Sequence, residues 1–157
     1  MNLKNEQSIQ AGSACGLKYE WKADTLVISN QLNESVAELS LKDGIYHDTW
    51  FGFVSGDQYR EIMEGPYLDF FRRSAVKKKL CNTLALMDGM DPETGSWFET
   101  SVMPKLIDAG LLYNAIVIPE DIFAKILMET FEANLQSNLA RLFPNEVAAL
   151  EWLKQVG

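Results

Sequence analysis

With 157 residues, of which 47% are apolar and 23% charged, the chain has the length and composition of one globular domain with a hydrophobic core. Its 22 acidic residues outnumber the 14 basic ones, and the net charge of -8 repels phosphate backbones, which argues against a nucleic-acid partner. No apolar run reaches the roughly 18 residues that span a bilayer, and the amino-terminal sequence lacks the apolar centre of a signal peptide. We therefore expect a cytoplasmic protein without membrane insertion.

Residues 1–16 are mostly polar, and we expect them to form a flexible tail ahead of a single domain at residues 17–157. Short segments rich in β-forming residues follow, separated by Asp, Asn and Gly, and they predict antiparallel strands joined by turns. One turn is centred on Asp43 and Gly44, a pair typical of a two-residue hairpin. The amino-terminal part of the domain is thus expected to be an antiparallel sheet.

The pattern changes from strand to helix at Ser55. Ser55 and Gln58 have the spacing of a capping box, in which each side chain bonds the backbone N–H of the other residue. Apolar residues then recur with helical spacing, which predicts a helix with one side facing the core. Pro66 lies within this helix and removes one backbone hydrogen bond, so we expect a kink near Gly65.

The rest of the chain alternates strands with helices. A helix is expected to begin at Asp91-Pro92, where Asp91 is the N-cap. The remaining elements are expected, in chain order, as a strand at 78–86, a helix at 91–110, a strand at 111–118, a helix from 119, a strand at about 138–143 and a helix at 145–155. This order predicts an α/β fold, a mixed β-sheet with parallel strands in its second half and about four flanking helices.

Few residues have the pattern of a catalytic site. His47 is the only histidine and is far in sequence from Cys81, which argues against catalysis by a Ser-His-Asp or Cys-His arrangement. The two cysteines lack CxxC spacing, and no phosphate-binding glycine motif is present, so we expect no metal ion and no cofactor. Cys81 is best explained as an apolar strand residue, and the five cations within residues 72–79 as a solvated cap.

The carboxyl ends of parallel strands gather at one edge of a sheet, where α/β domains usually bind their ligands. At this edge Asp88-Gly89 is expected to form a turn and Asp91 to cap a helix, which leaves Met90 as an exposed apolar tip. Eight residues are candidates for a partner-binding surface here: Asp88, Gly89, Met90, Asp91, Trp97, Pro119, Asp121 and Phe123.

The motif W-x-G-F-V-S-G-x-x-Y-R at Trp50 to Arg60 is followed by MPKLIDAGL, AIVIPEDIFAKI and AALEWLK. Together these motifs resemble the small bacterial STAS/SEC14-like proteins related to anti-sigma-factor antagonists, over roughly Tyr46 to Lys154. The resemblance implies a STAS-like fold that docks onto a protein partner and catalyses no reaction. In the antagonists a serine after the strand corresponding to NTLALM is phosphorylated, whereas this chain has no hydroxyl there before Thr94.

Three functions are compatible with these patterns. The first is a non-enzymatic regulatory domain that binds a protein partner through residues 87–97 and 119–123. The second is a carrier of a lipid or other small molecule, with aromatic residues such as Trp97 and Phe98 lining an apolar groove. The third is an uncharacterised enzyme that uses the carboxylates of Asp88 and Asp91. The aromatic content of 11% and the sheet edge near the hairpin also lead us to expect a homodimer.

Overall fold

The computed structural model describes residues 13–87, 91–117 and 140–157, which form an α/β fold around one mixed sheet. Its strands lie side by side in chain order. They are β1 (Lys18–Lys22), β2 (Thr25–Ser29), β3 (Ser35–Lys42), β4 (Ile45–Gly52), β5 (Lys78–Leu86), β6 (Tyr113–Val117) and β7 (Ala140–Phe143). Strands β1 to β4 pair antiparallel, whereas β4 to β7 pair parallel. The predicted mixed sheet, antiparallel first and parallel second, is confirmed.

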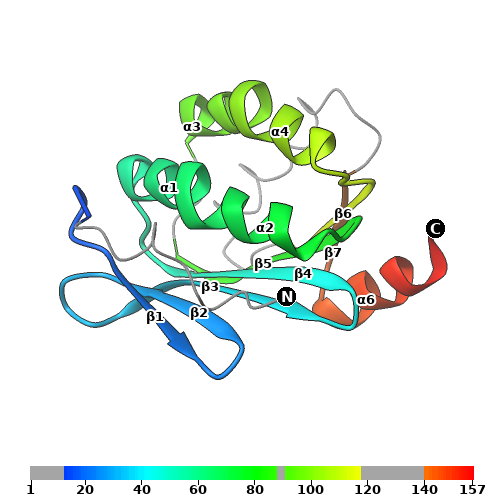
Figure 1. Ribbon diagram of the computed structural model, residues 1–157, viewed down its shortest axis with the longest axis horizontal. Coiled ribbons are helices and arrows are strands. Elements are labelled where there is room, and N and C mark those ends of the chain that lie inside the picture. Colours follow the sequence, from blue (N-terminus) through cyan, green and yellow to red (C-terminus); the bar gives the residue numbers. More distant parts are fainter. Residues whose placement is uncertain (1–12, 88–90, 118–139) are drawn as a thin grey trace.

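Three helical stretches belong to the described ranges. The elements are α1 (Gly56–Ile62), a π-helical turn (Met63–Tyr67) and α2 (Leu68–Ser74), then α3 (Pro92–Trp97), a second π-helical turn (Phe98–Val102) and α4 (Met103–Asp108), and finally α6 (Glu146–Gln155). Helices α1 to α4 lie over one face of the sheet and α6 lies on the other (Figure 1). None of these helices is long and apolar enough to cross a lipid bilayer. The helix expected after Pro119 lies outside the described residues, so the total of about four helices is untested.

Local sequence explains where the first helical stretch begins and bends. The Ser55 hydroxyl accepts a hydrogen bond from the Gln58 N–H at 3.1 Å, and the Gln58 side chain accepts one from the Ser55 N–H at 3.0 Å, which confirms the capping box. The expected kink occurs at Gly65, whose φ of -105° and ψ of -106° are not helical. Pro66 follows directly, and the chain forms the wider π-helical turn here.

The hairpin between β3 and β4 is also confirmed. Its two central residues, Asp43 and Gly44, have φ of 54° and 75°. Two successive positive φ angles make the tight turn whose twist matches that of the adjoining strands. The turn sets the register in which Lys42 faces Ile45 and Leu39 faces Asp48. Local turn chemistry therefore determines which side chains of β4 point toward the helices.

A hydrophobic core lies on each face of the sheet. The larger core fills the space between the sheet and helices α1 to α4, and the smaller core lies between the sheet and α6. Successive residues of β4 point into different cores, since side chains alternate between the two faces of a sheet. Tyr46 belongs to the larger core and Ile45 to the smaller. The smaller core consists of Ile45, Leu80, Ala115, Val117, Ala149 and Leu153. Ala149 and Leu153 of α6 therefore face the sheet.

The segment before β1 contacts the first helix through one carboxylate. Glu61 on α1 accepts hydrogen bonds from the Ser13 hydroxyl, from the Cys15 N–H at 3.3 Å and from the Tyr19 hydroxyl at 2.7 Å. Partial burial raises the pKa of Glu61, but these hydrogen bonds outweigh burial, so its pKa is lowered. Residues 13–16 of the expected tail are thus held against α1, and residues 1–12 lie outside the described part of the chain.

Ala75 offers a test of the backbone geometry at the end of α2. It has φ of 54° and ψ of 34°, a left-handed conformation in which a Cβ costs roughly 1 kcal/mol. We expect Ala75→Gly to raise the free energy of unfolding by about 0.5 kcal/mol, since relief of this strain exceeds the entropy that glycine adds to the unfolded chain. Urea denaturation measures the change.

Ala109→Gly is the matched control, because Ala109 ends α4 with φ of -81° and has no such strain. There the same substitution should lower the free energy of unfolding by up to about 1 kcal/mol. A loss of stability in both variants would contradict the left-handed geometry at Ala75.

Candidate functional site

A cavity lies between strands β4 to β6 and the beginnings of the two helical stretches that cover them. Its free volume is about 70 Å³, whereas one water molecule needs roughly 10–15 Å³, so the cavity has room for several waters or for part of a small organic molecule. The lining residues are Asp48, Trp50, Val54, Ser55, Gly56, Tyr59, Met63, Tyr67, Lys79, Cys81, Thr83, Leu86, Asp91, Thr94, Phe98, Asn114 and Ile116.

The polar residues of the cavity occupy inward positions of three neighbouring strands. Side chains alternate between the two faces of a sheet, so Asp48 on β4 shares a face with Tyr46 and Trp50. In the parallel register Lys79 on β5 lies next to Tyr46 on one side and next to Asn114 of β6 on the other. A carboxylate, an ammonium group and an amide are therefore gathered on the face that the helices cover.

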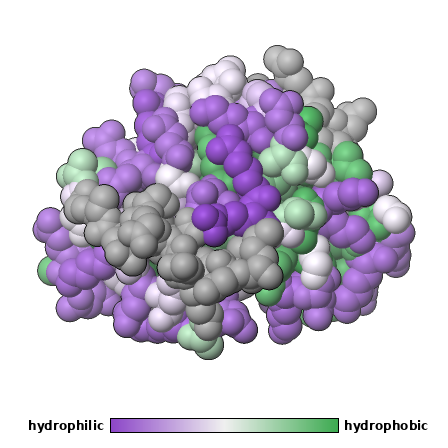
Figure 2. Space-filling view, viewed as in Figure 1, coloured by the Kyte–Doolittle hydropathy of each residue, from purple (hydrophilic) through white to green (hydrophobic). Residues whose placement is uncertain are grey.

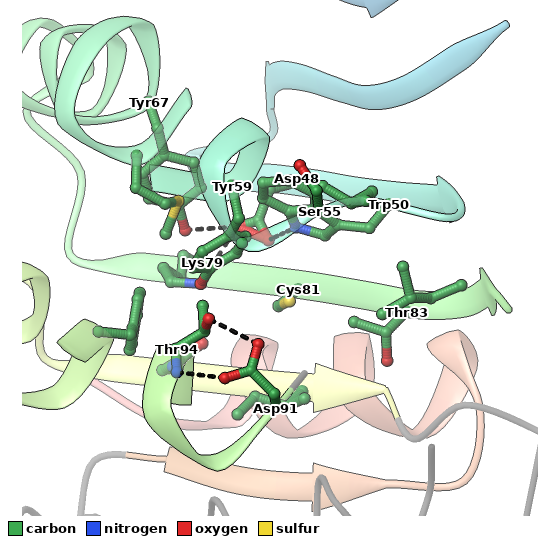
Figure 3. Close-up of a pocket in the computed structure, with 17 residues that line it drawn as sticks. Asp48, Trp50, Ser55, Tyr59, Tyr67, Lys79, Cys81, Thr83, Asp91 and Thr94 are labelled. Carbon is green, nitrogen blue, oxygen red and sulfur yellow. Dashed lines mark hydrogen bonds and ion pairs between the residues drawn. The ribbon is translucent and has the colours of Figure 1, made fainter. Parts of the chain in front are cut away.

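Asp48 is the centre of the hydrogen bonding in the cavity. Its Oδ2 accepts a hydrogen bond from the Tyr67 hydroxyl at 2.6 Å and one from the Lys79 Nζ at 3.1 Å. Its Oδ1 accepts one from the Trp50 indole N–H at 3.2 Å. Figure 3 shows these side chains converging between β4, β5 and the helix. Three donors from three parts of the chain thus hold one carboxylate in place.

Asp48 and Lys79 form an ion pair out of contact with solvent. The exposed fractions of the two residues are 1% and 2%, and the Lys79 ammonium also lies 5.5 Å from the centre of the Tyr67 ring. Removing either charge alone leaves the other without compensation, at a cost of about 3–5 kcal/mol. The two opposite charges sum to zero. The floor of the cavity, formed by Asp48, Lys79 and Asn114, is therefore polar but carries almost no net charge.

The same surroundings raise the pKa of the acidic groups near Asp48. Burial, followed by the negative charge of Asp48, raises the pKa of the Tyr67 hydroxyl and that of the Cys81 thiol. A thiol with a raised pKa is protonated at neutral pH and is a poor nucleophile. The interpretation of Cys81 as an apolar strand residue agrees with this result.

Asn114 is the one lining residue whose buried polar atom has no partner. It is 1% exposed, and its Oδ1 has no hydrogen-bond donor within reach in the structure as described. A buried amide oxygen without a donor costs roughly 1–3 kcal/mol, and proteins usually satisfy such atoms. Since the described residues supply no donor, a group bound in the cavity can serve as the partner for this oxygen.

Asp91 and Thr94 line the cavity at the beginning of α3. The two oxygens of Asp91 accept hydrogen bonds from the Thr94 N–H and from the Thr94 hydroxyl, both at 2.8 Å. These bonds lower the pKa of the Asp91 carboxyl and confirm it as the expected N-cap. A Cβ on Gly56 would lie 3.1 Å from the Thr94 hydroxyl, so the beginnings of α1 and α3 are in close contact.

The structure brings only part of the predicted partner-binding surface into view. Asp91 lines the cavity, whereas Trp97 packs beside it, with its ring 6.3 Å from Tyr59 and under the Arg60 guanidinium at 5.2 Å. Phe98, one of the aromatic residues expected to line a groove, does line the cavity. The other predicted surface residues lie outside the described ranges; they are Asp88, Gly89, Met90, Pro119, Asp121 and Phe123.

Sequence analysis missed the polar floor of the cavity. The prediction of a solvated cap at residues 72–79 is wrong for Lys79, which is buried against Asp48. Asp48 and Asn114 were not candidates at all, although Asn114 is a polar residue within a strand segment that is otherwise apolar or aromatic and Asp48 lies in a strand with aromatic residues on both sides. That pattern is the one indication of this site in the sequence.

Neither a metal centre nor a known family explains the cavity. Within residues 13–87, 91–117 and 140–157, no three His, Cys, Asp or Glu side chains are placed to hold a metal ion together. Comparison of the chain with protein-family models, with curated proteins and with solved structures finds no match. The resemblance to STAS/SEC14-like proteins therefore stays a prediction, and the function has to be argued from the site.

The ion pair can be tested by removing its positive member. We expect Lys79→Met to lower the free energy of unfolding by about 3–5 kcal/mol, because the Asp48 carboxylate is then buried without a counter-charge. Adding Asp48→Asn should recover most of this loss, since no charge remains buried. Urea denaturation of the single and double variants provides the measurement.

Lys77→Met is the control, because Lys77 is an exposed lysine two residues away. It should change stability by less than about 0.5 kcal/mol. Equal stability of Lys79→Met and Lys77→Met would show that the Asp48–Lys79 pair is not buried in solution.

Proposed function

We propose that this domain binds a small molecule in the cavity beneath α1 and α3 and that it does so without catalysing a reaction. The observation that carries the proposal is Asn114, which lines the cavity and whose buried side-chain oxygen has no partner among the described residues. Sites for small molecules are typically apolar cavities with a few polar groups that fix the orientation of the ligand. The Asp48, Lys79 and Asn114 floor under apolar walls has this composition.

The apolar walls come from elements that are fixed by the larger core. Trp50 and Tyr59 have ring centres 5.1 Å apart, and Tyr59 lies 6.3 Å from Phe98, so three aromatic rings from different elements form one wall. Buried Met63 and Ile116 also line the cavity. A wall of rings held by their neighbours keeps its shape when a ligand is absent, which lowers the cost of binding.

The cavity also lies where α/β domains usually bind ligands. Its lining includes Leu86 at the end of β5, Ser55 after β4 and Asp91 before α3. These residues lie at or just after the carboxyl ends of parallel strands, the edge at which ligand sites form in sheets of this kind, whereas Lys79 and Asn114 lie near the amino ends of β5 and β6. Part of the lining is therefore at the usual position of a ligand site, and the composition of the cavity supports the same function.

The chemistry of the lining supports binding more than catalysis. The Cys81 thiol has a raised pKa, both Asp91 oxygens accept hydrogen bonds within the helix cap, and three donors occupy Asp48. A nucleophile or general base needs a free lone pair close to the substrate and a pKa suited to proton transfer. This argument favours the non-enzymatic alternative over an enzyme built on the Asp88 and Asp91 carboxylates.

The proposal can be tested by filling the cavity. We expect native mass spectrometry of the gently purified chain to show a retained small molecule, and we expect Ile116→Phe to lose it because the larger side chain occupies the space. Val147→Phe is the control, because Val147 is 67% exposed on α6, on the opposite face of the sheet.

A fragment screen covers the case in which the molecule is lost on purification. The indole N–H signal of Trp50 should move on ligand binding, whereas that of Trp152, in the second core, should stay fixed. A wild-type chain that retains nothing, together with a diverse fragment set that leaves Trp50 unmoved, would contradict the proposal.

Protein docking at the same edge of the sheet is the second candidate function. Phe53 and Met87 are 64% and 60% exposed, and the Met87 N–H donates a 2.9 Å hydrogen bond to the Gly52 carbonyl, so the two apolar residues follow neighbouring strand ends. Hydrophilic side chains predominate over the face seen in Figure 2, with apolar ones in small groups. A pair of exposed residues is small beside the roughly 800 Å² that each partner buries in a stable interface.

This candidate predicts weak self-association through the Phe53–Met87 pair, in line with the expected homodimer. Sedimentation equilibrium should show a dimer only at high protein concentration, and the double variant Phe53→Ser/Met87→Ser should abolish it because the exposed apolar contact is lost. A monomer at every concentration, or a dimer that the double variant leaves intact, would remove the Phe53–Met87 pair as an interface.

A further inference from the structure

We propose that the cavity selects neutral ligands bearing a hydroxyl group and that this group binds between Lys79 and Asn114. The inference rests on the small-molecule function proposed above and names the chemical class of the ligand. It is drawn from three features of the cavity floor. Among the described residues, the Asn114 oxygen has no hydrogen-bond donor, the Lys79 ammonium has more hydrogens than acceptors, and the charge of Lys79 is balanced by that of Asp48.

The two polar groups are adjacent because of the sheet register. Lys79 on β5 is the register partner of Asn114 on β6, so both side chains leave the same face of neighbouring strands, which run roughly 4.8 Å apart. The Lys79 ammonium has three hydrogens, and in the described structure Asp48 is its one hydrogen-bond acceptor. Asn114 Oδ1 accepts no hydrogen bond from the residues that the structure describes. A donor for one group and an acceptor for the other are therefore needed at neighbouring points.

A hydroxyl group meets both needs with a single atom. Its O–H donates to Asn114 Oδ1, while its oxygen lone pairs accept from Lys79 Nζ. An apolar group at this point leaves the Asn114 oxygen without a donor. The floor thus favours an alcohol or phenol over a hydrocarbon of the same shape.

The charges around the floor disfavour an anion. Asp48 lies 3.1 Å from Lys79 and already balances its charge. A ligand carboxylate placed at Lys79 brings a second negative charge into a buried site, close to Asp48. Asp91 adds another carboxylate to the lining, and its lowered pKa keeps it ionised at neutral pH. A cationic ligand would be repelled by the Lys79 ammonium. A neutral ligand is therefore preferred.

The body of the ligand is set by the walls above this floor. Trp50, Tyr59 and Phe98 present ring surfaces, and the wall is completed by aliphatic side chains. Such a wall binds a compact apolar or aromatic group through contact area. It has few polar groups that could distinguish one such group from another. The polar discrimination is left to Lys79 and Asn114.

Three probes with one ring and different end groups test this selection. Benzyl alcohol, toluene and benzoate are titrated into the full chain at pH 7, with the Trp50 indole N–H signal as the readout and Trp152 as the internal control. We expect benzyl alcohol to bind most tightly and benzoate most weakly. Asn114→Leu should weaken benzyl alcohol about tenfold and leave toluene unchanged or tighter, since only the alcohol uses the amide oxygen.

Asn114→Ala removes the same oxygen without adding any bulk, and it serves as the second variant should the leucine variant not fold. Tightest binding of benzoate would overturn the inference in favour of an anion site at Lys79. Equal binding of all three probes, with no effect of either Asn114 variant, would overturn it in favour of a purely apolar cavity. Both results leave the small-molecule function standing.

Failure of all three probes to move Trp50 at their solubility limits would overturn the inference for this ligand class. The small-molecule function fails separately, when no compound of a diverse fragment set moves Trp50 and cavity filling by Ile116→Phe changes no retained mass. The two failures are therefore distinguishable.

Discussion

The buried ion pair between Asp48 and Lys79 is the interaction on which the arrangement around the cavity depends. Two charges removed from water are tolerated only where further hydrogen bonds complete their solvation, and here Tyr67 and Trp50 supply them. Tyr67 reaches the pair from the π-helical turn that contains the Gly65 kink, and the hydroxyl of Tyr46 donates to the Tyr67 carbonyl at 3.0 Å. The pair thus ties β4, β5 and the bent helix to one another.

Such a pair adds little to stability compared with apolar side chains of the same size, so its presence calls for another explanation. It creates a polar patch on the floor of a core that is otherwise apolar, and the sheet register places the unpartnered Asn114 oxygen beside it. A floor of this kind orients a bound molecule, which apolar walls alone cannot do. This observation supports the proposal that the pair is part of a small-molecule site.

Features set by sequence neighbours were predicted well, and features set by distant contacts were not. The Ser55 cap, the Asp43-Gly44 turn and the Pro66 kink each depend on residues within one turn of the chain, where spacing is sufficient evidence. The partner of Lys79, in contrast, is 31 residues away, and a run of neighbouring cations made Lys79 look solvated. Asn114 was missed because it lies among apolar residues. The hydrophobic pattern predicts which strand is buried, but it does not show whether one polar atom has a hydrogen-bond partner.

The central claim is that a bound molecule completes the floor at Lys79 and Asn114. A high-resolution crystal structure of the gently purified chain tests this claim most directly. The account predicts continuous density larger than a water molecule, within hydrogen-bond distance of both Lys79 Nζ and Asn114 Oδ1 and extending between Trp50 and Phe98. A structure in which the Asn114 oxygen is bonded to a group of the protein, with side chains filling the space above it, would contradict the account.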